Sequence, residues 1–345
     1  MNKVFNKLIK IIKIVSANLI ILVLCLVLTI FTVELFHRYK YLIKLPPDDT
    51  LTVTFGHKVK NNRFGYRERD FSYQFLKQQD FIVVVLGDSL TWGVGLSESQ
   101  RYSNLLERYL KSEYPDKKIA VLNYAIDSGA TTEERDILRL IYKEIKPNLI
   151  IVGFCLNDPQ EKPQNYSVER EYYFSKIEPL LSFFNKKRMN GTTRLISRVY
   201  ENILTSTKKI PTWLDALDRV YRKDSLAWHR FETALRDINS MAKEVSSNPP
   251  IFISLNQGVS NSMPTDYAKP DGILENYFMR WYHQAESTAR NQGFIAINCE
   301  EEFSVKLRKH VMAVIPGGDG HPSAEMNEIY AQKLLSVIQK DKLFK

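Results

Sequence analysis

Apolar runs alternate with helical periodicity along most of the chain. Five short runs predict buried β-strands, at residues 81–86, 119–125, 149–156, 250–257 and 293–303. The segments between them, such as YSNLLERYLKSEY and EERDILRLIYKEI, place apolar residues three and four positions apart, which is the spacing of a helix with one buried face. Strands that alternate with helices in this way predict a parallel sheet covered by helices.

Residues 159–248 break this rhythm. They are rich in aromatic and basic residues, and they contain helical spacing without an evident strand. Because they follow the third predicted strand, they leave the sheet at its carboxyl edge, where open α/β folds bind ligands. We expect an inserted helical subdomain that serves either as a packing appendage or as a lid or substrate groove.

A long apolar segment stands near the N-terminus. Residues 14–33 carry no charge, and at about 1.5 Å per residue a helix of this length covers the ~30 Å hydrocarbon core of a bilayer. A cleaved signal peptide has a shorter apolar core followed by small residues, and no such site follows here. We therefore expect an uncleaved, single-pass membrane anchor.

The charges that flank this segment predict its orientation. Four lysines and the terminal amine precede it, and three basic residues follow it, which favours a cytoplasmic N-terminus and an extracytoplasmic remainder. The chain then divides into an N-terminus with anchor at 1–44, a stalk and lead-in at 45–80, and one large domain at 81–345.

Charge and cysteine content exclude several classes of protein. The first 44 residues hold seven Lys/Arg and one acid, which leaves 41 Lys/Arg against 38 acids in the remainder. That balance is too even for a nucleic-acid surface. The three cysteines, Cys25, Cys155 and Cys299, give no disulfide framework, and we expect the last two to be buried thiols. No CxxC or His-rich cluster indicates a metal, so we expect no metal and no cofactor.

Polar residues gather where predicted strands end. In a parallel sheet the carboxyl ends of the strands meet at one edge, so residues far apart in sequence converge there. A serine at such a place is either a turn residue or a nucleophile, and a nucleophile needs a base and oxyanion donors. The residues available for those roles are Asp88, Ser89, Gly129, Asn157, Asp158, Asp319 and His321.

Four sequence blocks, GDSLTWGVG, LNYAIDSGATT, CLNDP and DGHP, occur in that order. They resemble the SGNH, or GDSL-type, hydrolase family, whose blocks carry a Ser, a Gly, an Asn and a His. The resemblance implies a flavodoxin-like three-layer α/β sandwich with a five-stranded parallel sheet, here with a helical insertion and an N-terminal transmembrane helix. The stretch NNRFGYRERDF at 61–71 is similar to the lead-in of membrane-anchored members.

The resemblance also implies roles for individual residues. Ser89 would be the nucleophile, His321 the general base, and Asp319 the carboxylate that orients the imidazole. The oxyanion hole would consist of the backbone N–H groups of Ser89 and Gly129 and the side-chain amide of Asn157. Asp88 and Asp158 would support their loops.

Two spacings depart from the family pattern. Asn123 and Gly129 are six residues apart where family members usually have five, so that Ser128 stands at the expected place and either amide is a candidate for the oxyanion hole. Asp319 and His321 are two residues apart where three is common.

The expected function is that of a membrane-anchored, extracytoplasmic serine ester hydrolase. Its substrates would be acylated carbohydrates or other esters, and we expect it to remove acyl groups, acetyl in particular, from cell-surface or extracellular glycans. An O-acyltransferase that uses the same acyl-enzyme is the first alternative, because the acceptor depends on how well the site excludes water. A catalytically silent glycan-binding module is the second.

Overall fold

The structure is a computed structural model, and it describes residues 2–40, 51–54, 57–160, 167–187, 189–256, 278–302, 305 and 320–344. The chain forms two compact units, which we describe separately. The catalytic unit consists of Leu45–Gln164 and Trp213–Lys345, and the helical unit consists of Met1–Lys44 and Asn165–Thr212.

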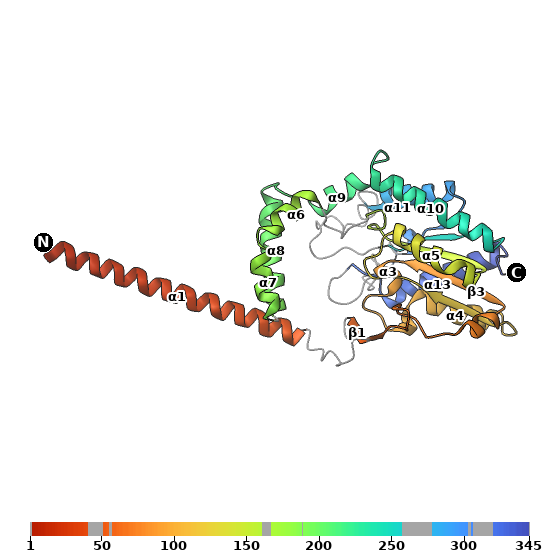
Figure 1. Cartoon of the computed structure of the whole chain (residues 1–345), viewed down its shortest axis with the longest axis horizontal. Helices are drawn as coiled ribbons and strands as arrows, with labels where there is room; N and C mark the ends of the chain where they lie inside the picture. The colour runs from red at the N-terminus through yellow and green to blue at the C-terminus, as the bar shows by residue number, and fades with distance from the viewer. Residues whose placement is uncertain are drawn as a thin grey trace. The chain divides into compact units, whose positions relative to one another are not determined.

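The catalytic unit is built on a five-stranded parallel sheet (Figure 1). Its strands lie in the order β4-β3-β5-β6-β7. Their bounds are β3 Phe81–Gly87, β4 Ile119–Asn123, β5 Leu149–Phe154, β6 Ile251–Ser254 and β7 Ile295–Ile297. Every residue of β3, β4 and β5 is buried, because a parallel sheet carries helices on both faces.

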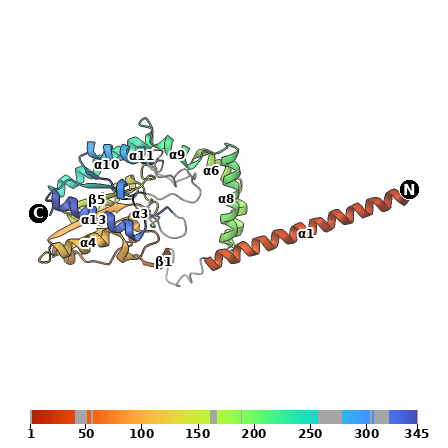
Figure 2. The same cartoon turned by 180° about the vertical axis from the view of Figure 1, so that it is seen from behind.

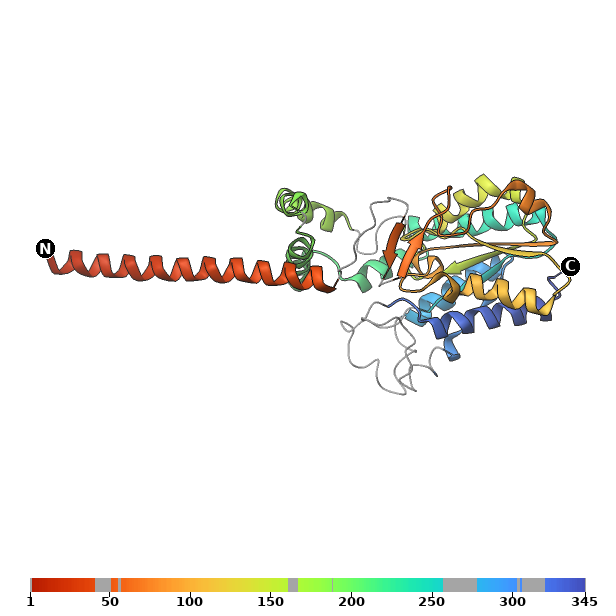
Figure 3. The same ribbon diagram turned by 90° about the horizontal axis from the view of Figure 1, so that it is seen from below.

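Helices cover both faces of the sheet, which gives three layers (Figure 3). The first face packs against α5 (Thr131–Ile145), α10 (Leu226–Val245) and α11 (Phe278–Asn291). The second face packs against α4 (Tyr102–Glu113) and α13 (Ala324–Lys340), which lie side by side (Figure 2). Successive strand residues alternate between the two cores: Ile82, Val84 and Leu86 face one, and Phe81, Val83 and Val85 face the other.

The predicted α/β fold with its five parallel strands is confirmed, and the strand ends differ. The run at 293–303 forms only the three-residue strand β7, and residues 300–302 are helical. Inside the expected insertion at 159–248, α10 packs on the sheet through Trp228, Phe231 and Leu235. The periodicity of α10 predicted a helix with an apolar face, and the structure shows that this face belongs to the central sandwich.

The lead-in before β3 packs onto the catalytic unit. It contains the antiparallel pair β1 (Leu51–Thr54) and β2 (His57–Lys60), and the short helix α2 (Tyr73–Lys77). Arg69 forms a bidentate pair with Glu107 of α4 at 2.6 and 2.8 Å, and Glu107 accepts the backbone N–H of Val121 in β4 at 2.8 Å. Glu68 accepts the Asn123 N–H at 2.9 Å. These contacts connect the lead-in to β4, the strand that pairs with β3.

The helical unit contains α1 (Asn2–Lys40), α6 (Val168–Ser175), α7 (Glu178–Lys186) and α8 (Asn190–Ser206). Within α1, the segment Ile14–Phe36 is long and apolar enough to cross a membrane, by length and composition, and such a segment fits either a membrane anchor or a signal sequence. The helices α6 and α8 are joined by an ion pair between Arg170 and Glu201 at 3.3 Å.

Candidate active site

Ser89 is the first residue of the short helix α3 (Ser89–Trp92), which follows β3 after a tight turn. Gly87 ends β3 with a φ of +156°, and a Cβ at this position would meet Thr91 Oγ1 at 2.2 Å and the backbone of β5 at 3.0 Å. A side chain here would therefore clash with the helix and with the neighbouring strand. Asp88 then caps α3, because its carboxylate accepts the N–H of Leu90 at 2.9 Å. The turn holds the serine as the first residue of the helix.

His321 lies against this serine. Its Nε2 is 3.0 Å from Ser89 Oγ, although 232 positions separate the two residues in the chain. His321 precedes α13, whose first turn is capped by Ser323 accepting the Met326 N–H at 3.3 Å. The contact arises because β3 ends and α13 begins at the same edge of the sheet. Asp319 lies outside the described residues, so its role stays a prediction.

Asp88 contacts both Ser89 and Asn157. Its Oδ2 accepts the Ser89 hydroxyl at 3.1 Å and the Asn157 Nδ2 at 3.2 Å. Asp88 is fully buried, and burial raises the pKa of its carboxyl above the ordinary range, while the Leu90 N–H and the nearby His321 oppose the shift. The Ser89 hydroxyl has one proton, so it donates either to Asp88 or to His321.

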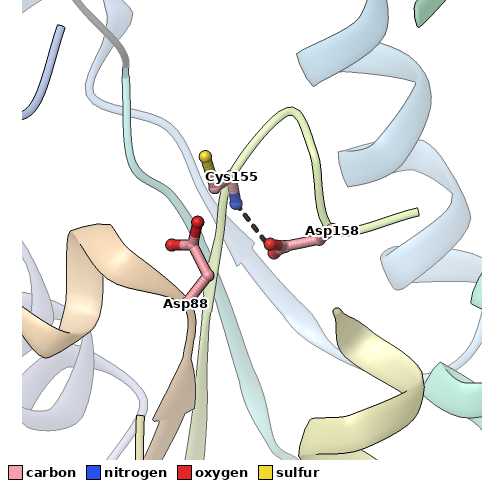
Figure 4. Close-up of side chains that lie close together, drawn as sticks. All are labelled: Asp88, Cys155 and Asp158. Carbon is pink, nitrogen blue, oxygen red and sulfur yellow. Dashed lines mark hydrogen bonds between the residues drawn. The ribbon is translucent and has the colours of Figure 1, made fainter. Parts of the chain in front are cut away.

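A tight turn after β5 presents Asn157. The backbone N–H of Cys155 donates to Asp158 Oδ2 at 2.8 Å (Figure 4). The Asp158 N–H donates back to the Cys155 carbonyl at 3.0 Å. The Cys155 thiol donates to Asn157 Oδ1 at 2.7 Å. With Oδ1 on the thiol, the amide nitrogen is directed toward Asp88, to which it donates at 3.2 Å.

The donor atoms of Asp88, Cys155 and Asp158 lie within 4.8 Å of one another, as metal ligands would. Hydrogen bonds already use both Asp88 oxygens and Asp158 Oδ2. These carboxylates thus hold the turn, and burial raises the pKa of the Cys155 thiol well above its ordinary value.

The second block contains a turn that accommodates its extra residue. Ser128 has a left-handed backbone with φ of 63°, and the Gly129 N–H donates to the Ile126 carbonyl at 3.1 Å. The Gly129 amide is thus engaged within its own turn. Asn123, at the end of β4, contacts α3 by donating from Nδ2 to the Thr91 carbonyl at 2.9 Å.

Two buried arginines, which the sequence reading did not single out, hold the loop after α3. Arg67 donates to the carbonyls of Trp92, Gly93 and Leu96 at 3.1, 2.6 and 2.6 Å. Arg101 donates to the Arg67 carbonyl at 2.5 Å. Burial, together with the charge of Arg101, lowers the pKa of Arg67 to about 10. The motif NNRFGYRERDF contains Arg67 and was the sequence signal that could have pointed to this residue. The hydrogen-bond partners of Arg67 are backbone carbonyls, which a sequence motif does not reveal.

Two buried carboxyls, those of Glu134 and Asp158, lie on the other side of the site. The sequence pattern indicated Asp158 but not Glu134. Glu134 is fully buried in the first turn of α5, and neither of its carboxyl oxygens has a hydrogen-bond partner among the described residues. Burial and the charge of Asp88 raise the pKa of Glu134 well above its ordinary value, and burial and Glu134 do the same for Asp158. The stretch TTEERD is typical of an exposed helix N-terminus, so no sequence signal indicated that Glu134 is buried.

A serine and a histidine in contact at the carboxyl edge of a parallel sheet define a serine hydrolase of the α/β class. Residues 83–334 match the sequence model of the family described as GDSL-like Lipase/Acylhydrolase, and the chain belongs to this family. It is a serine esterase. No curated protein sequence matches the chain.

Several solved structures are similar to this chain. Axe2, an acetyl xylan esterase from Geobacillus stearothermophilus, shares 15% identity over 75% of this chain and 95% of that chain, with a TM-score of 0.45. LAE5, an alpha/beta hydrolase from the metagenome of Lake Arreo, shares 14% identity over 77% and 98%, with a TM-score of 0.45. The psychrotrophic esterase EstA from Pseudoalteromonas sp. shares 11% over 76% and 98%, with a TM-score of 0.41. At these values none of their activities transfers to this chain.

Proposed function

We propose that this esterase is anchored in a membrane by α1, with its catalytic unit outside the cytoplasm, and that it removes acyl groups, acetyl in particular, from cell-surface or extracellular glycans. The observation that carries its catalytic part is the 3.0 Å contact between Ser89 Oγ and His321 Nε2. A hydroxyl at hydrogen-bond distance from an imidazole is the arrangement in which the imidazole takes the proton as the oxygen attacks.

In this mechanism Ser89 Oγ attacks the ester carbonyl while His321 takes its proton. The imidazolium then gives that proton to the leaving alcohol, and a water molecule later repeats the exchange to release the acid. Asp319 is proposed to hold the imidazole in the tautomer that has Nε2 free to accept. Asp88 competes for the same hydroxyl proton in the resting state, so attack begins from the rotamer that faces His321.

The oxyanion forms beside three proposed donors. The Ser89 N–H belongs to the first turn of α3, where backbone N–H groups have no partner within the helix, and the Asn157 side-chain amide is oriented by its bonds to Cys155 and Asp88. Gly129 would contribute its N–H only if the bond to the Ile126 carbonyl opened. Each donor is worth about 100- to 1,000-fold in rate.

The glycan part of the proposal rests on location. Substrates outside the cytoplasm include cell-surface polymers, and the charges that flank the apolar segment at 14–33 favour that topology. The aromatic content of 159–248 gives weaker support, because Trp228 and Tyr221 lie in the buried core and Lys176 covers the ring of Tyr172 at 4.1 Å.

The test uses the full chain, purified in detergent, with acetylated glycans and short p-nitrophenyl esters, each with and without sugar acceptors. We expect release of free acetate from at least one glycan, and none from Ser89→Ala. Acetate that appears only on an added sugar would favour the acyltransferase. A reporter fused after Lys345 tests the topology, because it should be active only outside the cytoplasm.

A further inference from the structure

The helical unit exposes a row of apolar side chains. On α8, Leu195, Val199 and Ile203 follow one another at four-residue spacing and are 38, 48 and 53% exposed. On α7, Leu180 and Phe183 are 46 and 55% exposed. Residues four apart lie on one face of a helix, so α8 presents a continuous apolar stripe.

Basic residues accompany this stripe. Residues 165–212 hold nine Lys/Arg and four Glu, whereas the globular part as a whole is nearly balanced. Lys186, Lys187 and Arg198 are exposed, and Arg198 directly precedes Val199. A helix with one apolar face flanked by long basic side chains is typical of segments that lie in the surface of a bilayer.

The N-terminus of α8 is joined to the end of the apolar segment of α1. Glu34, which is 7% exposed and two residues from the end of Ile14–Phe36, accepts the backbone N–H groups of Gly191 and Thr192 at 3.1 and 3.3 Å. These are first-turn N–H groups of α8, and its own N-cap residue supplies no side-chain cap. The carboxylate therefore caps α8 and meets the positive end of its dipole.

This cap fixes where α8 begins relative to the proposed anchor. In Figures 1 and 3, α8 runs crosswise to α1 and does not continue its direction. If α1 crosses the bilayer, a helix that starts at the end of its apolar segment and runs crosswise to it follows the plane of the membrane surface.

We propose that α7 and α8 lie on the bilayer surface where α1 emerges, with the stripe Leu195, Val199 and Ile203 at the boundary of headgroups and acyl chains and the neighbouring bases at anionic headgroups. This inference rests on the proposed membrane anchor. It assigns to the helical unit a lipid-binding role that is separate from catalysis.

A nitroxide spin label at residue 199 tests the proposal in the full chain. Val199→Cys is prepared with Cys25→Ala and reconstituted in vesicles of phosphatidylcholine and phosphatidylglycerol. Cys155 and Cys299 are buried and their thiol pKa values are raised by burial, so they do not compete for the label. Ile21→Cys within α1 and Arg236→Cys at an exposed position of α10 are the matched controls.

Collision rates with oxygen, which enters lipid, and with a nickel chelate, which stays in water, report the depth of the label. We expect the label at residue 199 to collide several-fold less with nickel than the label at residue 236, and to lie shallower than the one at residue 21. A water-exposed label at 199 beside a lipid-embedded one at 21 would overturn this inference and leave the anchor standing. Water exposure at both positions would refute the anchor as well.

Two further results separate lipid from protein contact. A label at 199 that neither reagent reaches would mean that a second copy or the catalytic unit covers the stripe, which would overturn the proposal. Raising the phosphatidylglycerol fraction should deepen the label, and Lys186→Glu, Lys187→Glu and Arg198→Glu together should abolish that dependence. If the dependence persists in this triple variant, the proposed role of the bases is wrong.

Discussion

The two sides of the turn that carries Ser89 bury charged groups in opposite ways. On one side, Arg67 and Arg101 keep their charge and donate to backbone carbonyls of the loop after α3 and of the lead-in. On the other side, Glu134 has no hydrogen-bond partner for either oxygen among the described residues, and Asp158 has one for only one of its two. Both sides are nearly inaccessible to water.

The difference follows from the chemistry of the two groups. A guanidinium cannot release its proton in the physiological range, so its burial is tolerated only with acceptors around it. A carboxyl can take up a proton and become neutral, so it can be buried with few partners. The arginine side therefore fixes the geometry of the turn, and the carboxyl side makes its stability depend on pH.

The largest expected effect is a loss of kcat, and the two substitutions that cause it change neither the arginine side nor the carboxyl side of the turn. Ser89→Ala and His321→Ala should each lower kcat by on the order of a millionfold, and the double variant should cost little more, because the two residues act as a unit. Their unfolding transitions should stay close to that of the unmodified protein, as urea denaturation would check. A double variant whose loss equals the product of the single losses would argue against a shared step.

Next in size is Asn157→Ala, which removes the proposed side-chain oxyanion donor. We expect kcat to fall by about 100- to 1,000-fold with KM little changed, since this contact strengthens in the transition state. Steady-state kinetics on a p-nitrophenyl ester measure it. A change confined to KM would assign Asn157 to substrate binding.

On the arginine side, Arg67→Met should lower the free energy of unfolding by about 3 kcal/mol, because three carbonyls lose a charged donor. Arg63→Met, at an exposed position in the same lead-in, is the matched control and should change it little. Denaturant titration at neutral pH compares the two. Equal losses of unfolding free energy in the two variants would mean that the buried contacts of Arg67 stabilise the fold no more than those of an exposed arginine.

On the carboxyl side, the sign of the pH effect is opposite to that of an ordinary ion pair. The pKa of Glu134 is raised from 4.5 in the folded state, so above that pH the unfolded chain releases a proton that the folded chain retains. Stability from this site is complete below about pH 4.5 and is lost as the pH rises towards the folded pKa. Glu134→Gln should therefore flatten the decline in unfolding free energy with rising pH.

The control for this variant is Glu133→Gln, which removes the neighbouring, exposed carboxylate. It should flatten the slope less than Glu134→Gln does, because the charge of Glu133 only adds to the pKa shift that the burial of Glu134 causes. If both variants flatten the slope equally, the effect comes from charge at the start of α5 and not from burial of Glu134.

The same contrast explains how much the sequence could predict. Strand positions were predictable because continuous apolar runs such as 81–86 and 149–156 leave few alternatives. The family was predictable because four blocks occur in order, while the role of Ser89 as nucleophile stays a prediction. The helix α10 was predictable as a helix, but periodicity does not say against which surface Phe231 and Leu235 pack. Glu134 could not be found, because an acidic residue in a first helical turn is ordinary and only the tertiary fold buries it.

The central claim, that Ser89 is the nucleophile, is tested most directly by covalent labelling. The full chain is treated with a fluorophosphonate and the modified peptide is mapped by mass spectrometry, with Ser89→Ala as the control. We predict one adduct, on Ser89, that forms much more slowly in His321→Ala. An adduct on another serine, or none in a folded sample that hydrolyses esters, would contradict the claim.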